Sequence, residues 1–257
     1  DDYALITVLI NGDEEVSSAG SRELITRLGT EHDAVFSCEG GGASDRLALT
    51  TAGIGAVLLR VRGRASHAGS APEQGRNALY ELAHQVLQMR DLTNANAGIK
   101  LNWTIASAGA TRNVIPAVAR ATADFRVLRV AAYDEVERLV RERIREQLID
   151  GTTVDVSFER RRPPLEATDE SRALAAHAQS IYRELDRRLT VSDQAAGGGT
   201  DAAFAALESD APVIEGFGLI GFGAHSDARE SVDLRSVVPR LYLLTRMVMD
   251  VGQGLTP

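Results

Sequence analysis

Two adjacent acidic residues, Glu14 and Glu15, follow Asp13 at the end of an apolar run near the start of the 257-residue chain. The run, residues 4–10 (ALITVLI), predicts a buried strand, so the carboxylates stand where that strand ends. Neighbouring residues there point in different directions, which lets one carboxylate bind a metal while the next faces a water held by that metal. This division of roles suits a metal-assisted hydrolase. The alternative is an exposed acidic turn, which is the commoner outcome for an isolated Asp-Glu-Glu.

Two histidines lie in loops made of small residues. His67 stands in the segment 66–69 (SHAG), and His225 stands in the segment 221–227 (GFGAHSD). Neutral imidazole is a favoured zinc ligand, and small neighbours let a metal come close. A third acid, Glu39, follows a predicted strand at residues 33–38 and precedes three glycines. A lone loop histidine is more often a solvated polar residue, so each of these signals is weak when it is taken alone.

Two further residues have the donors that a carboxylate needs. Asn113, in the segment 112–116 (RNVIP), offers two amide hydrogens, and Arg162, the last of three consecutive arginines, offers a planar fork. The ordinary alternatives are a simple turn and a solvated arginine. The pair motivates the hypothesis of a substrate with a free carboxylate.

The composition, 44% hydrophobic and 25% charged with a net charge of -8, is that of a globular chain. The acidic balance argues against nucleic acid or an anionic membrane as a general partner, and no apolar run approaches the ~20 residues of a membrane span. Cys38 is the only cysteine, which favours the cytoplasm. The chain starts without Met, almost directly in a predicted strand, and we interpret this as a cut through a longer domain. A periplasmic or secreted location therefore stays open.

The periodicity of apolar residues predicts an α/β protein with an inserted α+β domain. In the insert we expect the order β-α-β-β-α-β of a ferredoxin-like domain, with its elements at residues 54–61, 77–90, 99–106, 117–127, 133–148 and 152–158. Outside it we expect helices at 21–28 (stopped by Gly29), 170–188, 201–207 (capped by Thr200) and 237–251, and strands at 189–192 and 212–215. The predicted domains are residues 1–52 and 163–257, the two segments of a catalytic domain, and residues 53–162, a lid inserted between them.

Together these motifs resemble the dizinc aminoacylase and carboxypeptidase family, and within it the bacterial glutamate carboxypeptidases that cleave folates. The motifs occur in the family's order: Asp13-Glu14-Glu15, Cys38-Glu39, Ser66-His67-Ala68-Gly69, Asn113-Val114-Ile115-Pro116, Gly198-Gly199-Thr200-Asp201-Ala202 and Gly223-Ala224-His225-Ser226-Asp227. The resemblance covers the whole chain. It implies zinc, two ions in a complete site, and hydrolysis of an amide bond next to a free carboxylate, with release of C-terminal glutamate or a similar amino acid.

The resemblance also implies a role for each matching residue. Glu14 corresponds to the general base, and Glu15, Glu39 and His225 correspond to zinc ligands. His67 corresponds to a lid histidine that reaches the active site of a neighbouring protomer and stabilises the oxyanion, which implies a homodimer formed through the lid. The substrate, a small peptide or acyl-amino acid, is expected to contact Asn113, Arg162, Gly199 and Thr200.

One part of the family pattern has no match. The family carries a His-x-Asp motif and a metal-bridging Asp upstream of the Asp-Glu-Glu, and His32, His84 and His177 do not replace them. We therefore expect that this chain alone does not assemble a full two-metal site. Two alternatives remain: an aminoacylase or desuccinylase, which uses the same constellation, and a non-catalytic dimerising relative.

Overall fold

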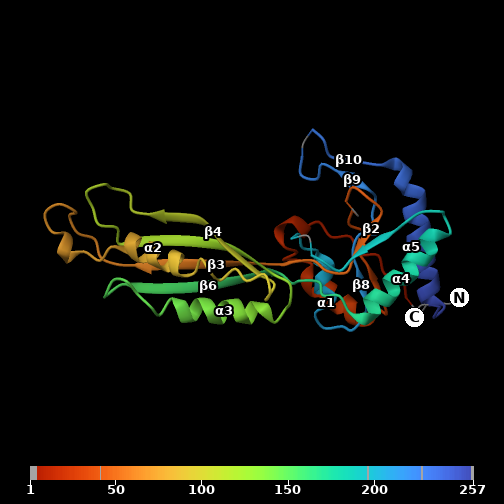
Figure 1. The fold of residues 1–257 in the computed structure, drawn as a ribbon, viewed down its shortest axis with the longest axis horizontal. Helices are drawn as coiled ribbons and strands as arrows, with labels where there is room; N and C mark the ends of the chain where they lie inside the picture. Colours follow the sequence, from red (N-terminus) through yellow and green to blue (C-terminus); the bar gives the residue numbers. More distant parts are fainter. Residues whose placement is uncertain (1–4, 41, 196, 227, 256–257) are drawn as a thin grey trace. The chain divides into compact units, whose positions relative to one another are not determined.

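The chain folds into two compact units. The structure is a computed structural model that describes residues 5–40, 42–195, 197–226 and 228–255. Unit 1 comprises Asp1–Ala52 and Arg162–Pro257, and unit 2 comprises Gly53–Arg161 (Figure 1). Arg162, the last residue of the insert expected from the sequence, therefore clusters with unit 1.

Unit 2 has the predicted β-α-β-β-α-β order. Its elements are β3 (Gly53–Arg62), the 3-10 turn η2 (Pro72–Gln74), α2 (Ala78–Gln88), β4 (Ile99–Ala108), β5 (Val118–Val127), α3 (Ala132–Arg143) and β6 (Thr153–Arg162). The strands form one sheet in the order β4-β5-β3-β6, and β5 runs antiparallel to both β3 and β4. The fold class predicted from the sequence is confirmed for this unit.

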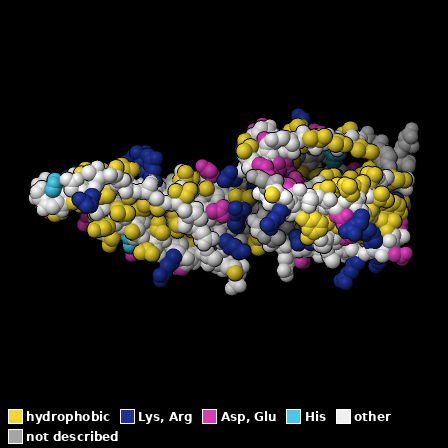
Figure 2. Space-filling view, turned by 90° about the horizontal axis from the view of Figure 1, so that it is seen from above, with side chains coloured by type: hydrophobic (Ala, Val, Ile, Leu, Met, Phe, Trp, Pro, Cys, Tyr) yellow, Lys and Arg dark blue, Asp and Glu magenta, His cyan; other side chains and the backbone are white. Residues whose placement is uncertain are grey.

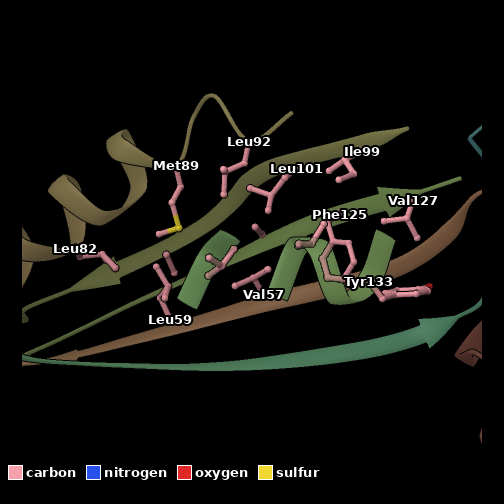
Figure 3. Packing of buried hydrophobic residues seen from close by; sticks show 14 of the residues in the cluster. Val57, Leu59, Leu82, Met89, Leu92, Ile99, Leu101, Phe125, Val127 and Tyr133 are labelled. Atoms are coloured by element: carbon pink, nitrogen blue, oxygen red, sulfur yellow. The ribbon is translucent and has the colours of Figure 1, made fainter. Parts of the chain in front are cut away.

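The core of unit 2 lies between the sheet and its two helices (Figure 3). Alternate residues of β3, among them Val57 and Leu59, are buried, as expected for a sheet covered on one face. The helices add apolar side chains to the same cluster, and Tyr133 of α3 meets Phe125 of β5 edge-on at 5.7 Å between ring centroids. Helix α2 begins at Asn77, whose side chain accepts two backbone hydrogen bonds of the first turn.

Unit 1 consists of helices around three short strand pairs. Its elements are η1 (Glu14–Val16), α1 (Arg22–Glu31), β1 (Val35–Phe36), β2 (Arg46–Ala48), α4 (Asp169–Arg183), β7 (Thr190–Ser192), η3 (Asp201–Phe204), β8 (Val213–Ile214), β9 (Gly221–Phe222), β10 (Ser231–Val232), η4 (Leu234–Ser236) and α5 (Val237–Gly252). Strands β1 and β8 pair in parallel, as do β2 and β7, whereas β9 and β10 pair antiparallel. No helix in the described part of the chain has the length and hydrophobicity needed to cross a membrane.

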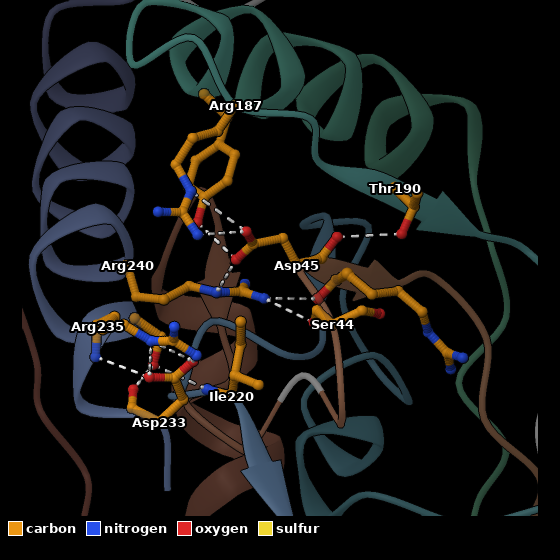
Figure 4. Close-up of polar contacts among 11 residues, drawn as sticks. Ser44, Asp45, Arg187, Thr190, Ile220, Asp233, Arg235 and Arg240 are labelled. Atoms are coloured by element: carbon orange, nitrogen blue, oxygen red, sulfur yellow. Dashed lines mark hydrogen bonds and ion pairs between the residues drawn. The ribbon is translucent and has the colours of Figure 1, made fainter.

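A polar cluster centred on the partly buried Asp45 joins the strands and helices of unit 1 (Figure 4). Its carboxylate accepts a hydrogen bond of 2.6 Å from Tyr182 of α4 and pairs with Arg187 and Arg240. Arg240, from α5, is almost fully buried and also donates to the carbonyl of Gly216. Asp45 and the two arginines are thus paired with groups of opposite charge, which is the condition for tolerating a charge away from water.

The predicted first strand is wrong. Residues 5–10 form no strand and pair with none in the part of the chain that the structure describes, and Ala4 lies outside it. A strand is stabilised by its ladder partners, so an apolar run without them stays irregular. Its apolar side chains are all exposed, and Figure 2 shows hydrophobic side chains over much of the visible surface of unit 1.

Several predicted boundaries are also wrong. The strand expected at 33–38 is reduced to Val35–Phe36, the helix expected at 201–207 is only the 3-10 turn η3, and α4 ends at Arg183. Helix α3 ends at Arg143 rather than at residue 148, because the backbone N–H groups of Leu148 and Ile149 donate to the buried carboxylate of Glu81. Tertiary hydrogen bonds here replace helical ones.

Gly29 does not stop helix α1, which continues to Glu31. A Cβ atom at Gly29 would lie 2.2 Å from the carbonyl oxygen of Ala205, just after η3. The glycine is therefore required because the helix and the η3 backbone touch.

We predict that Gly29→Ala destabilises unit 1 by about 1–3 kcal/mol, the usual cost of overpacking, even though alanine favours helix. Urea unfolding followed by circular dichroism measures the change. The matched control is Gly12→Ala, because nothing lies within 4 Å of a Cβ atom at Gly12. Equal stability of the two variants would contradict the close approach.

Candidate metal and substrate site

The acidic turn is held in place by Asp13. Its carboxylate accepts hydrogen bonds from the Gly20 N–H at 2.7 Å and the Ser21 hydroxyl at 2.6 Å. These two donors, the hydroxyl first, lower the pKa of Asp13. Asn11 donates to Asp13 and also to Asp201 at 2.6 Å, which ties the turn to η3. Asp13 therefore anchors the turn and leaves the two glutamates free for other partners.

Glu14 turns towards the inside of unit 1 and meets Arg162. Its Oε1 lies 2.6 Å from the guanidinium, and the same arginine donates to the Glu14 carbonyl oxygen. Burial raises the pKa of Glu14, the positive charge of Arg162 opposes that rise, and the charges of Glu15, Glu39 and Asp201 add to it. A carboxyl group with a raised pKa is better suited to take up a proton than an ordinary surface glutamate.

Glu15 turns the other way, towards solvent and His225. Its Oε1 lies 3.8 Å from Nδ1 of His225, and both side chains are about three-quarters exposed, at 77% and 76%. His225 adopts a left-handed backbone conformation with φ of 62°. A carboxylate oxygen and an imidazole nitrogen at this separation match the ligand types of zinc.

Glu39 lies past the end of β1 and is exposed. Its N–H donates to the Ser37 hydroxyl at 3.5 Å, and its carbonyl accepts from Gly218 at 2.9 Å. Its charge contributes to the raised pKa of Glu14. The end of β1 and the acidic turn are thus electrostatic neighbours in unit 1.

The donor types suit a metal, but the ligand set is incomplete. Glu15 and His225 can hold one ion between them, since both side chains are accessible and adjacent. Within residues 5–40, 42–195, 197–226 and 228–255, no three His, Cys, Asp or Glu side chains are grouped closely enough to hold a metal. Asp227, part of the sequence motif, lies outside the described residues.

Gly199 and Thr200 form the loop that leads into η3. The Thr200 side chain is almost fully buried and accepts a hydrogen bond from the Ala202 N–H, so it caps η3 as the sequence predicted. The Gly198 carbonyl accepts from Ala52 at 2.8 Å. The loop is held at both ends, with Gly199 between them.

His67 and Asn113 are brought together in unit 2. The Ala68 N–H donates to the Asn113 carbonyl at 2.9 Å, and His67 bridges to Val114. Nδ1 of His67 accepts from the N–H groups of Gly69 and Ser70, both at 3.1 Å. Because Nδ1 is an acceptor, the neutral ring carries its hydrogen on Nε2, where it can be donated to an anionic oxygen.

One acidic residue of this region did not stand out in the sequence. Glu215 follows β8, is buried with 8% of its surface exposed, and accepts a hydrogen bond of 3.0 Å from Ser37. Burial raises its pKa. Glu14, Glu39 and Glu215 all follow apolar runs, so the position of an acid at the end of a predicted strand was the signal that could have found it.

Comparisons with known proteins show what the chain is similar to. Residues 49–152 match the profile of the family described as peptidase dimerisation domain. Over 254 residues the chain is 43% identical to carboxypeptidase G2 of Pseudomonas sp. (strain RS-16), and the match covers 98% of this chain and 61% of that protein. A segment of 71 residues is 38% identical to a homologue of p-aminobenzoyl-glutamate hydrolase from Haemophilus influenzae, covering 27% of this chain and 17% of that one.

Solved structures show the same fold. An aminopeptidase PepT from Bacillus cereus superposes with a TM-score of 0.75 at 19% identity, covering 91% of this chain and 60% of that one. A Bacillus subtilis protein described as a dinuclear metal-binding peptidase of the M20 family gives a TM-score of 0.69 at 14% identity, with 93% and 62% covered. The chain spans about three fifths of the length of the relatives that it matches.

Fold and matches together describe a two-unit α/β chain whose middle matches a peptidase dimerisation domain and whose fold is shared with a dinuclear metal-binding peptidase of the M20 family. The resemblance found in the sequence is confirmed, and the chain is a relative of carboxypeptidase G2 along nearly its whole length.

We predict that Arg162→Met raises the pKa of Glu14, because it removes the one charge that favours the ionised carboxylate there. Titration of the Glu14 side-chain carbon by NMR measures the shift. Arg161→Met, at the exposed neighbouring residue, makes the same change in net charge and is expected to leave Glu14 nearly unmoved. A similar response in both variants would show that the contact does not set the protonation of Glu14.

Proposed function

We propose that this chain supplies the general base, part of the metal ligand set and the carboxylate-binding groups of a zinc-dependent hydrolase. The bond cleaved is an amide next to a free carboxylate, and the product is C-terminal glutamate or a similar amino acid. The observation that carries the proposal is the opposite orientation of two adjacent carboxylates, Glu14 towards buried Arg162 and Glu15 towards exposed His225. The name of the carboxypeptidase relative supports release of a C-terminal residue, and the name of the aminobenzoyl-glutamate hydrolase relative supports glutamate as that residue.

Each residue has a defined part in this scheme. Glu15 and His225 would hold a zinc ion, with Glu39 expected from the resemblance as a further ligand, and the bound ion would lower the pKa of water and polarise the amide carbonyl. Glu14 accepts the proton of the attacking water and returns it to the leaving nitrogen, and its raised pKa brings it nearer to that task. His67 is expected from the resemblance to serve the site of a neighbouring protomer, where it donates from Nε2 to the developing oxyanion.

The substrate carboxylate is assigned to Arg162, Gly199 and Thr200 of unit 1, with one condition, and Asn113 of unit 2 is a further contact that the family resemblance implies. Arg162 is buried and forms an ion pair with Glu14. Its guanidinium can therefore bind a substrate carboxylate only when this ion pair breaks or when it contacts both carboxylates at once. Asn113 keeps an exposed side chain. A homodimer through residues 49–152 is part of the proposal, because the matched family is described as a dimerisation domain.

A second candidate is a non-catalytic dimerising relative. It is favoured by one observation, the lack of a group of three metal-binding side chains in the described part of the chain. Aminoacylase or desuccinylase activity is a third reading, which uses the same residues and differs only in the amino acid released.

We predict that a protein containing this chain and a complete metal ligand set, supplied with Zn²⁺ or Co²⁺, releases glutamate from acyl-glutamates faster than it releases other amino acids from their acyl derivatives. Glu14→Gln is expected to reduce kcat by about 10²–10⁴-fold, the usual contribution of a general base. Chromatography of the released amino acids measures both effects.

The matched control is Glu23→Gln, an exposed glutamate of α1. Hydrolysis with another amino acid preferred would favour the aminoacylase reading. Metal binding without any hydrolysis, or no metal binding, would contradict the proposed function and favour the non-catalytic relative.

A further inference from the structure

Glu215 is a buried acid that the proposed reaction does not use. Its backbone N–H and C=O both bond to Ala48 of β2 at 2.9 Å, so the residue stands on a fixed strand pairing. The side chain is turned inward, and its Oε2 is fully buried and has no hydrogen-bond partner among the described residues. A buried carboxylate with an unused oxygen costs free energy and calls for an explanation.

The other oxygen of Glu215 connects two parts of the candidate site. Oε1 accepts from the Ser37 hydroxyl at 3.0 Å, and that hydroxyl accepts from the Glu39 N–H at 3.5 Å. A hydrogen bond with the side chain of Thr200 also acts on the carboxyl group and opposes the rise in its pKa. Glu215 therefore contacts the segment that carries one proposed metal ligand and the loop that carries one proposed substrate contact.

We propose that Glu215 is a positioning residue that fixes Glu39, through Ser37, and the Gly199–Thr200 loop at the same time. This inference rests on the proposed function for the roles of Glu39 and Thr200. The mechanism is contact of one rigid carboxylate with two side chains: the Ser37 hydroxyl donates to Glu215 and accepts from the Glu39 N–H, and the Thr200 hydroxyl, which acts on the Glu215 carboxyl group, accepts from the Ala202 N–H. Residues that orient metal ligands in this way commonly change metal affinity by roughly 10–100-fold when removed.

Glutamine separates this role from a purely electrostatic one. Its amide oxygen can accept the Ser37 hydroxyl as the carboxylate does, whereas the glutamine side chain carries no charge. Burial raises the pKa of Glu215, so the acid's contribution to stability is full below its ordinary value of 4.5 and is lost as the pH rises through the raised pKa. Glu215→Gln avoids that loss and is expected to fold at neutral pH.

The test is a Co²⁺ titration of the full chain, followed by the visible absorption of the bound ion. We expect Glu215→Ala to weaken Co²⁺ binding by about 10–100-fold, and Glu215→Gln to keep affinity within about threefold of the unmodified chain. Ser37→Ala should weaken binding as well, and the double variant with Glu215→Ala should be no weaker than Glu215→Ala alone, because both changes break one chain of contacts.

The control variant is Glu208→Ala, which removes an exposed glutamate from the same unit. Melting curves of all samples separate lost affinity from lost folding. Equal weakening by Glu215→Gln and Glu215→Ala would show that charge, not positioning, is what matters. Additive effects of the Ser37 and Glu215 changes would also overturn the proposal.

Hydrogen exchange keeps the test independent of the metal. In Glu215→Ala the amides of residues 37–39 and 198–202 should exchange faster together, and Glu215→Gln should restore both segments. If the unmodified chain binds no Co²⁺ but shows this pattern, the proposed function fails and the positioning role stands. If only one segment responds, or neither does, the positioning role fails.

Discussion

The ion pair between Glu14 and Arg162 is the interaction on which the site depends. It joins the acidic turn near the start of the chain to the residue at which the chain returns from unit 2, 148 positions later. The buried guanidinium lowers the pKa of the partly buried Glu14 carboxyl group, whereas desolvation and three other acids raise it. Without this ion pair, the turn would be held by the hydrogen bonds of Asp13, and the inward orientation of the Glu14 side chain would lose its stabilising contact.

The consequence is a division between two neighbouring carboxylates. Glu14 is drawn inward, so the next residue along the 3-10 turn, Glu15, is directed outward to His225. Asp13 and Asn11 fix the turn on η3, and Glu215 stands beside the neighbouring strand end. Buried polar contacts thus set the directions of exposed groups, which is the arrangement that a metal site requires from its surroundings.

The sequence predicts unit 2 well because its signals are local. Alternating burial in β3 and β5, the Asn77 cap and the apolar stripe of α2 are all visible in the order of residues. Unit 1 is harder to predict, since its strands are two or three residues long and depend on partners far along the chain. The failure at residues 5–10 has this cause, because an apolar run indicates burial but does not supply a neighbouring strand.

The candidate site shows the same limit. Motif order indicated Glu14, Glu15, Glu39 and His225, but no pattern in the sequence could show that Arg162 faces Glu14 or that Glu215 faces Ser37. The central claim, that Glu15 and His225 hold one ion together, is tested most directly by anomalous diffraction from crystals of the chain grown with Zn²⁺. We expect a zinc peak about 2.0–2.2 Å from a Glu15 oxygen and a His225 nitrogen. Zinc bound at other residues, with Glu15 and His225 unligated, would contradict the account.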